Sequence, residues 1–353
     1  MKRLALLAVL ASGTPALAAA PGAQARKTFE QAAALYDRAR FAEALAAFDK
    51  AIALFPGWKT AAAYRAVCRW SLGDSKGAGE DAALGLKLDP NSAESYTARG
   101  KARMLARDLA GAAADFKKAL TLDRDFAEAH YGLASVLSAQ GDVPGSIKSL
   151  DAAIRLNSEF AAALILRAQL KDKQKDYPGA AADYTAALAI NPRLTYAKLY
   201  RGKAYRDLKD YRSALTDLND YLDEQPDRVD ALYMRGNVKF LLGDFQGCVD
   251  DLSRVVELDP KKGLAYSNRG QARAQLGDRD GAIADLKRAL QLDPDRRDKI
   301  EAALDALQTA PQSEASARPQ LSPAPAAAPA ARAKTTGPSS EKNAGREDAN
   351  FVQ

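Results

Sequence analysis

The sequence contains little histidine, cysteine or aromatic side chain, and each shortage excludes a class of protein. His130 is the only histidine, so neither a histidine-rich metal site nor a histidine-based acid–base mechanism is expected. Cys68 and Cys248 are too few for a disulfide framework or a four-cysteine zinc site. Aromatic residues make up 7% of the chain, and alanine supplies much of its 47% hydrophobic fraction. This alanine-rich composition, with few β-branched runs, indicates helices.

The sequence also lacks a large excess of charge of one sign, and it lacks catalytic motifs. The 51 Lys and Arg residues nearly balance 45 Asp and Glu residues, which is typical of a mixed surface and not of a nucleic-acid binder. No nucleophile elbow, phosphate-binding loop, metal-ligand cluster or paired-carboxylate motif occurs. We therefore expect a protein that is not an enzyme, with no metal, no cofactor and no nucleic-acid partner. We interpret His130 as structural and both cysteines as buried, unpaired thiols.

The only long apolar run lies at the N-terminus, after Lys2 and Arg3. Residues 4–10 (LALLAVL) are too few to span a bilayer but are typical of a secretory signal. Small residues follow, and both Ala18 and Ala25 end small-x-small triplets that suit a signal peptidase. We expect residues 1–25 to hold a signal peptide, cleaved after Ala18 or Ala25, and the protein to be exported to a bacterial periplasm or secreted. No transmembrane segment is expected in the mature chain.

A period of 34 residues runs from residue 25 to residue 296 in eight copies without insertions. The eighth residue of each copy is small: Ala32, Ala66, Gly100, Ala134, Ala168, Gly202, Gly236 and Gly270. The twentieth is small as well: Ala44, Ala78, Ala112, Ser146, Ala180, Ala214, Cys248 and Ala282. Small side chains at both positions allow two helices to pack closely.

Each copy also carries signals for a turn between two helices and for a stop after the second. The sixteenth residue can cap the second helix and is aspartate in seven copies: Asp74, Asp108, Asp142, Asp176, Asp210, Asp244 and Asp278. Proline stands at the thirty-second position in six copies, where it ends the second helix. Each copy is therefore predicted to be helix, tight turn, helix. Gly77, Gly79 and Gly85 are expected to weaken the second helix of the second copy.

This pattern resembles the tetratricopeptide repeat (TPR), which has the same period, the same small positions and the late proline. The resemblance implies an all-α, right-handed α-solenoid of eight helix-turn-helix repeats over residues 26–296. Residues 297–310 place Ile300, Leu304 and Leu307 on one helical face and are predicted to be a capping helix. Residues 311–353 are rich in proline and alanine and are predicted to be a disordered tail.

Arginine and aspartate occur together at two further positions of the repeat. The seventh residue is Arg in six copies, and in the same six the twenty-third is Asp: Arg65 with Asp81, Arg99 with Asp115, Arg167 with Asp183, Arg201 with Asp217, Arg235 with Asp251, and Arg269 with Asp285. The other two copies lack both. This joint presence and absence favours ion pairs between the two helices of a repeat over a row of arginines that binds an anionic partner.

The resemblance also implies that the first helices line a concave groove, mainly through positions 2, 5, 9, 12 and 13. Two groups of candidate partner-binding residues follow. The first is the row at position 12: Tyr36, Trp70 and Met104, with Phe29 and Lys101 nearby. The second lies in the sixth and seventh copies: Tyr196, Leu199, Lys203, Arg206, Tyr233, Asn237 and Phe240. The second group suits a peptide with an acidic group; the alternative for both is packing between neighbouring helices.

Asn237 and Asn268 occupy positions that resemble two members of the carboxylate clamp of some TPR proteins. Tyr233 stands where that clamp has a lysine, so the sequence disfavours it. The function expected is a non-catalytic interaction scaffold of the cell envelope that binds a partner protein or peptide. Two alternatives are a periplasmic, chaperone-like holder of unfolded segments and an accessory subunit of an envelope enzyme or secretion complex.

Overall fold

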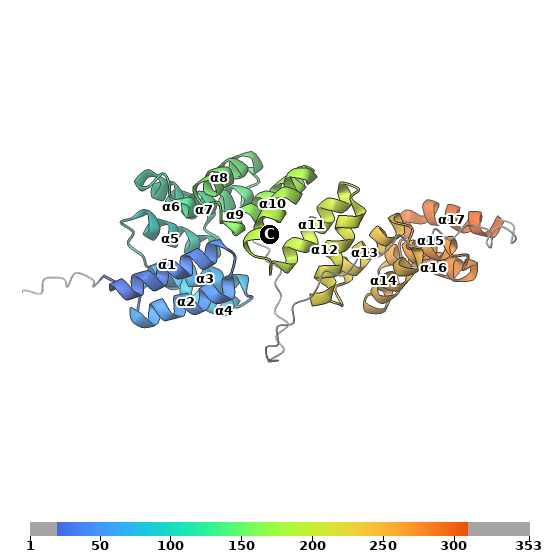
Figure 1. Cartoon of the computed structure of the whole chain (residues 1–353), viewed down its shortest axis with the longest axis horizontal. Coiled ribbons are helices and arrows are strands. Elements are labelled where there is room, and N and C mark those ends of the chain that lie inside the picture. The colour runs from blue at the N-terminus through green and yellow to red at the C-terminus, as the bar shows by residue number, and fades with distance from the viewer. Residues whose placement is uncertain (1–19, 310–353) are drawn as a thin grey trace, which may run out of the picture. The chain divides into compact units, whose positions relative to one another are not determined.

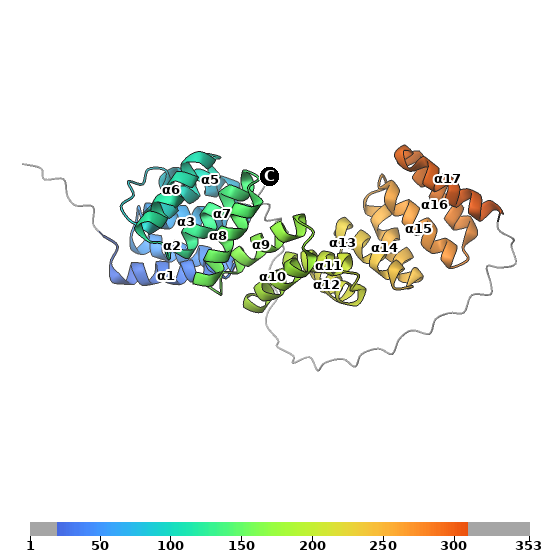
Figure 2. The same cartoon turned by 90° about the horizontal axis from the view of Figure 1, so that it is seen from above.

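A computed structural model describes residues 20–309 of the chain, and the elements of this part are all helices (Figures 1 and 2). The first helices of the eight pairs are α1 (Ala23–Asp37), α3 (Lys59–Ser71), α5 (Ala93–Leu105), α7 (Ala127–Ala139), α9 (Ala161–Lys173), α11 (Thr195–Asp207), α13 (Val229–Leu241) and α15 (Gly263–Gln275). The second helices are α2 (Phe41–Leu54), α4 (Ser75–Gly85), α6 (Leu109–Leu122), α8 (Val143–Leu156), α10 (Tyr177–Ile190), α12 (Tyr211–Glu224), α14 (Phe245–Leu258) and α16 (Arg279–Leu292). The predicted all-α class of helix-turn-helix pairs is confirmed. The predicted tail and Ala18 lie outside the described residues.

The turn inside each pair contains one left-handed residue, and in seven of the eight pairs a capping side chain follows it. The fifteenth residue of all eight repeats has a positive φ angle, and four of these residues are not glycine: Ala39, Arg107, Lys175 and Lys209. The aspartate that follows caps the second helix; for example, Asp142 accepts a hydrogen bond from the backbone N–H of Gly145 at 2.9 Å. The same cap forms at all seven aspartates of position 16. The chain therefore reverses direction by the same local mechanism in each of these repeats.

The glycines of α4 have different surroundings, which changes their expected effect. Gly77 donates to the capping Asp74, and a Cβ atom there would lie 2.2 Å from the carboxylate. Gly85 fits between Ala63 and Ala102, whose Cβ atoms would lie 2.9 and 2.8 Å from an added Cβ. Only Gly79 of the three has open space around it. Two of the three glycines therefore serve the cap and the packing of α4.

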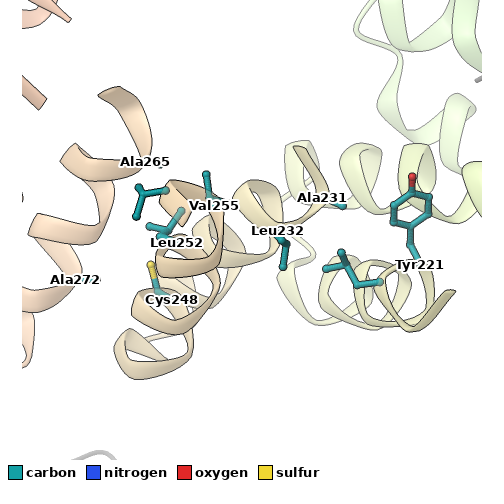
Figure 3. Close-up of a cluster of buried hydrophobic side chains, with 10 residues drawn as sticks. Tyr221, Ala231, Leu232, Cys248, Leu252, Val255, Ala265 and Ala272 are labelled. Carbon is teal, nitrogen blue, oxygen red and sulfur yellow. The ribbon is translucent and has the colours of Figure 1, made fainter. Parts of the chain in front are cut away.

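The chain forms two compact units. Of the described residues, the first contains residues 20–36 together with Arg40–Asp123, and the second contains Asp37–Ala39 together with residues 124–309. In the second unit each second helix packs on its own first helix and on the first helix of the next repeat. Figure 3 shows this around α14, where Leu252 and Val255 lie between Leu232 of α13 and Ala265 of α15.

The last repeat is covered by one more helix. A short 3₁₀ turn, Pro294–Arg296, leads into α17 (Arg297–Thr309). Ile300 and Leu304 of α17 are buried against Leu286 and Ala289 of α16. This contact removes from water an apolar face that the next repeat would otherwise cover.

The first unit packs differently, around an aromatic core. Phe29 of α1 contacts Phe48, Trp58 and Tyr64, with ring centroids 4.8 to 5.5 Å apart. Helix α3 is buried along most of its length, and α5 packs on α3 as well as on α4. The first helices α3 and α5 are thus joined more closely than consecutive first helices of the second unit.

Candidate functional site: a charge ladder and an amide network on the first helices

Each of the six arginines at position 7 forms a two-pronged pair with the aspartate at position 23 of its own repeat. Arg201 is representative: its Nε and Nη2 atoms each donate to one carboxylate oxygen of Asp217 at 2.7 Å. In the other five pairs the two distances range from 2.6 to 2.9 Å. The aspartate side chains are buried and the arginines are partly buried, so these pairs fix the second helix of a repeat against the first.

A second cation binds the same aspartate in five of the six repeats. It stands at position 11, one helical turn after the arginine: Arg69, Arg103, Lys171, Lys239 and Arg273. Repeat 6 has Tyr205 there, below the guanidinium of Arg201. This cation was not predicted from the sequence. The signal was available, because the two repeats without the Arg and Asp pair have leucine at position 11, Leu35 and Leu137.

Five of the six position-7 arginines also reach the preceding repeat through position 25; for Arg99 that position holds Ala83, and Arg99 donates instead to the backbone carbonyl of Leu88. The Nη1 atom of Arg65 lies 2.7 Å from Asp49, and that of Arg167 lies 2.7 Å from Asp151. In repeats 6, 7 and 8 the acceptors are uncharged: Thr185, Asn219 and Ser253. Because position 25 is aspartate, threonine, asparagine or serine in these repeats, the contact could not be predicted from one recurring residue type.

Hydrogen bonds and burial move the pKa values of the buried groups. The side-chain hydrogen bond that Arg201 donates to Asp217 raises the pKa of Arg201, and the bond that Arg65 donates to Asp81 does the same for Arg65. Burial raises the pKa of the Cys68 and Cys248 thiols to about 12. Both cysteines are free and fully buried. They are weak acids inside the core, and neither is placed as a reactive thiolate.

Several residues of the first candidate group are buried. Tyr36, expected on the binding face, is 2% exposed. The cause is Lys101 of α5, which is buried with its ammonium 4.2 Å from the centre of the Tyr36 ring and 3.7 Å from that of Tyr64. A two-pronged pair of Arg26 with Glu94, at 2.9 and 2.6 Å, joins α1 to α5 as well.

The rest of the first group is unequally exposed. Trp70 is 37% exposed and Met104 is partly buried, whereas Phe29 lies in the aromatic core. The three residues at position 12 therefore do not form one continuous exposed row. The sequence could not show this unequal exposure, because it depends on how α5 packs across α3 and onto residues of α1.

The second candidate group lies partly exposed on α11 and α13, but its cations are paired. The Lys203 ammonium lies 2.7 Å from Asp172 of α9, and Arg206 lies 2.7 Å from its neighbour Asp207. Leu199, Tyr233 and Phe240 pack at the edge of the hydrophobic cluster around Leu252. These three side chains thus combine the two alternatives, because they pack between helices and still keep exposed surface.

Three side chains at the joint of α13 and α15 form a hydrogen-bonded group, here called the amide network: Tyr233, Asn237 and Asn268. The Asn268 amide donates to Asn237 Oδ1 at 2.7 Å and to the Tyr233 hydroxyl at 3.1 Å. The Asn237 NH₂ group and the Asn268 carbonyl have no other partner within residues 20–309. If both amides are turned over, the pair still leaves one NH₂ group and one carbonyl open. The network can therefore donate at least one hydrogen bond and accept at least one from a ligand.

Other types of site find no support in the described residues. Residues 20–309 contain no group of His, Cys, Asp and Glu side chains arranged to hold a metal ion. His130 Nε2 donates a hydrogen bond to the backbone carbonyl of Arg124, 3.0 Å away, in the turn before α7. Within the same range, no helix combines the length and the apolar character that a bilayer crossing requires.

Comparisons with known proteins agree with this architecture. Family models described as tetratricopeptide repeat match residues 29–93, 103–170, 199–247 and 263–296, together more than half of the chain. No curated protein sequence matches the chain.

Many solved structures share the fold. The crystal structure of YrrB, titled a TPR protein with an unusual peptide-binding site, is 21% identical with a TM-score of 0.51, over 54% of this chain and 98% of that one. The Cut9 and Hcn1 hetero-tetramer of the APC/C is 16% identical with a TM-score of 0.57, over 79% of this chain and 55% of that one. At these identities the likeness concerns the fold alone.

Proposed function

Because the chain belongs to the tetratricopeptide repeat family, we propose that it is a non-catalytic scaffold that binds a partner peptide along α11, α13 and α15. Proteins of this family generally serve as scaffolds for interactions between proteins. The first helices of the second unit are favoured over those of the first, because α5 and Lys101 cover Tyr36 in the first unit. One fold neighbour, YrrB, is described by its title as having a peptide-binding site.

The observation that carries this proposal is the amide network. One open NH₂ group and one open carbonyl suit the C=O and N–H groups of a peptide bond in an extended chain. Phe240 and Leu199 supply partly exposed apolar surface on the same helices. An extended segment can therefore bond through its backbone and place apolar side chains on either side.

The test is a capture experiment with matched variants. The full chain, tagged and immobilised, is incubated with an envelope extract, and the captured proteins are identified by mass spectrometry. Asn237→Ala with Asn268→Ala should abolish capture of the main partner. Lys287→Ala, which removes one exposed charge from the second helix α16, should leave capture unchanged. If the double variant captures the same proteins, binding along these helices is wrong.

We further propose that the chain is exported and that the signal peptide is cut after Ala18. Helix α1 already begins at Ala23, Ala25 is buried, and Thr28 donates to the backbone carbonyl of Gln24 at 2.8 Å. A cut after Ala25 would remove this first turn and place a charged amine at the helix N-terminus, where the helix dipole disfavours a cation. Mass spectrometry of the mature protein should find Ala19 first. Arg26 first would contradict the site, and Met1 first would contradict export.

A further inference from the structure

The second unit pairs every cation of its three candidate helices with a carboxylate. Helices α11, α13 and α15 carry eight Lys and Arg residues. Each lies within 3.3 Å of an Asp oxygen: Lys198, Arg201, Lys203, Arg206, Arg235, Lys239, Arg269 and Arg273. The two acids of the same helices are paired too, Asp207 with Arg206 and Asp230 with Lys262. These helices therefore present no single unopposed charge.

Paired charges attract a charged ligand weakly. A carboxylate arriving at Lys203 would have to displace or share the ammonium with Asp172, which lies 2.7 Å away and whose side chain is mostly buried. The gain from the new pair would be offset by the loss of the old one. The same holds for Arg206 and Asp207. An acidic motif therefore gains little from Lys203 and Arg206, the two cations of the second candidate group.

The amide network, by contrast, keeps one NH₂ group and one carbonyl without a hydrogen-bond partner among the described side chains. Its open NH₂ and carbonyl groups match a peptide bond, which carries both functions and no charge. Apolar surface lies next to it, at Phe240 of α13 and Leu264 of α15, both partly exposed. The features left open on these helices are therefore those that an uncharged backbone and apolar side chains satisfy.

From this pairing we infer that the partner is an extended polypeptide segment recognised through its backbone and apolar side chains, without a requirement for charge. The inference rests on the proposed function and specifies its ligand. Helices α11, α13 and α15 would then bind neutral, extended segments of another protein. A short acidic motif would be the wrong partner.

Four synthetic peptides of twelve residues test this with the full chain. The first alternates leucine and serine; the second and third replace four serines with aspartate or with lysine; the fourth carries N-methyl groups on alternate residues, which remove backbone N–H donors. Binding is measured by fluorescence anisotropy at low and high salt. The first three should bind within about threefold of one another and change about as little between the two salts, since paired charges contribute little long-range attraction. The N-methylated peptide should bind at least about tenfold more weakly, a difference of about 1.4 kcal/mol.

Variants of the protein separate the possible outcomes. Asn268→Ala should weaken the neutral peptide, whereas the joint change Lys203→Gln with Asp172→Asn should leave its affinity unchanged, because it removes a neutralised pair. Lys287→Ala is the matched control. An acidic peptide that binds about tenfold more tightly than the neutral one, and loses this advantage in high salt, would overturn the inference while leaving peptide binding intact. If none of the four peptides binds, the proposed function itself fails.

Discussion

At the scale of single residues, the most informative group is the buried aspartate that receives two cations. Asp183 is held by Arg167 at 2.7 Å and by Lys171 at 2.9 Å. Asp217 has Arg201 alone, because repeat 6 has Tyr205 at position 11. Repeats 5 and 6 thus have the same arginine–aspartate pair with and without a second cation. This difference predicts how much each arginine contributes to stability.

Arg201→Ala should therefore destabilise the protein more than Arg167→Ala. The first change leaves the Asp217 carboxylate buried without a cation, which should lower the free energy of unfolding by about 3 kcal/mol. In Arg167→Ala the Asp183 carboxylate keeps Lys171, so the free energy of unfolding should fall by only about 1 kcal/mol. Urea denaturation followed by circular dichroism measures both. The double change Arg201→Ala with Asp217→Ala should recover part of the loss, because no buried charge remains. Equal losses for the two arginines would show that the second cation does not stabilise its aspartate.

The buried thiols predict a loss of stability in alkali. Burial raises the pKa of Cys68 to about 12, whereas an exposed thiol in the unfolded chain has a pKa near 8.5. Below pH 8.5 both states keep the proton and the contribution is complete. As the pH rises toward 12 only the unfolded state ionises, so stability falls.

By pH 10 the loss should amount to about 2 kcal/mol for Cys68. Cys248 and Tyr131, whose pKa values burial also raises to about 12, act in the same direction. Thermal unfolding of Cys68→Ala should show a smaller decrease between pH 7.5 and pH 10 than the native chain. An identical decrease would mean that the thiol does not ionise on unfolding.

The residue scale also separates what the sequence can predict from what it cannot. The joint presence of Arg and Asp at positions 7 and 23 predicted which side chains face each other, because the eight copies of the repeat can be compared within one sequence. The same reasoning could have found the cation at position 11. The burial of Tyr36 could not be foreseen, because it depends on Lys101, 65 positions later in the sequence, and on how closely α5 approaches.

At the scale of the helices, the fifteenth residue decides how well each pair turns. Its φ angle is positive in all eight repeats, but only Gly73, Gly141, Gly243 and Gly277 adopt this conformation without a steric cost. Elsewhere the residue is Ala39, Arg107, Lys175 or Lys209. The turn geometry was predictable from the glycines and the capping aspartates together. Three of the four repeats without the glycine keep the aspartate cap, whereas Ala39 is followed by Arg40, whose side chain makes no cap.

Lys175→Gly should stabilise the protein by about 0.5–1 kcal/mol. The left-handed conformation costs a residue with a Cβ atom about 1–2 kcal/mol, and the greater freedom of glycine in the unfolded chain cancels only part of that gain. Lys148→Gly in the exposed middle of α8 is the control and should cost about 1 kcal/mol. Thermal unfolding should therefore shift in opposite directions. A loss in both variants would show that Lys175 makes a stabilising contact that outweighs its strain.

At the scale of the whole molecule, stability is a sum of contacts between neighbouring elements. The second helix of each repeat in the second unit packs on the next first helix, and α17 covers the last of them. Destabilising one element should therefore affect its neighbours first. The period of 34 residues predicted this arrangement, because a repeated pair of helices buries its apolar face only by stacking on the next pair.

Replacing Ile300 and Leu304 of α17 with alanine should expose the end of α16. Each change removes a buried side chain and should cost about 2–4 kcal/mol of local stability. Hydrogen exchange measured by mass spectrometry should show reduced protection in α16 and α17, with α7 and α8 unchanged. Asp305→Ala, at an exposed position of α17, should change neither. A uniform loss of protection across both units would mean that the molecule opens as one cooperative body.

The hydrogen bonds from the position-7 arginines of repeats 7 and 8 to the preceding repeat have a consequence for how such a chain can be lengthened. Arg235 bonds to Asn219 of repeat 6, and Arg269 bonds to Ser253 of repeat 7. Repeat 7 therefore carries both halves of a junction, an arginine for the repeat behind it and an acceptor for the repeat ahead. A second copy of repeat 7 inserted after the first would meet its own Ser253 with its own Arg235. Gene duplication could thus lengthen this part of the protein with its junctions already complete.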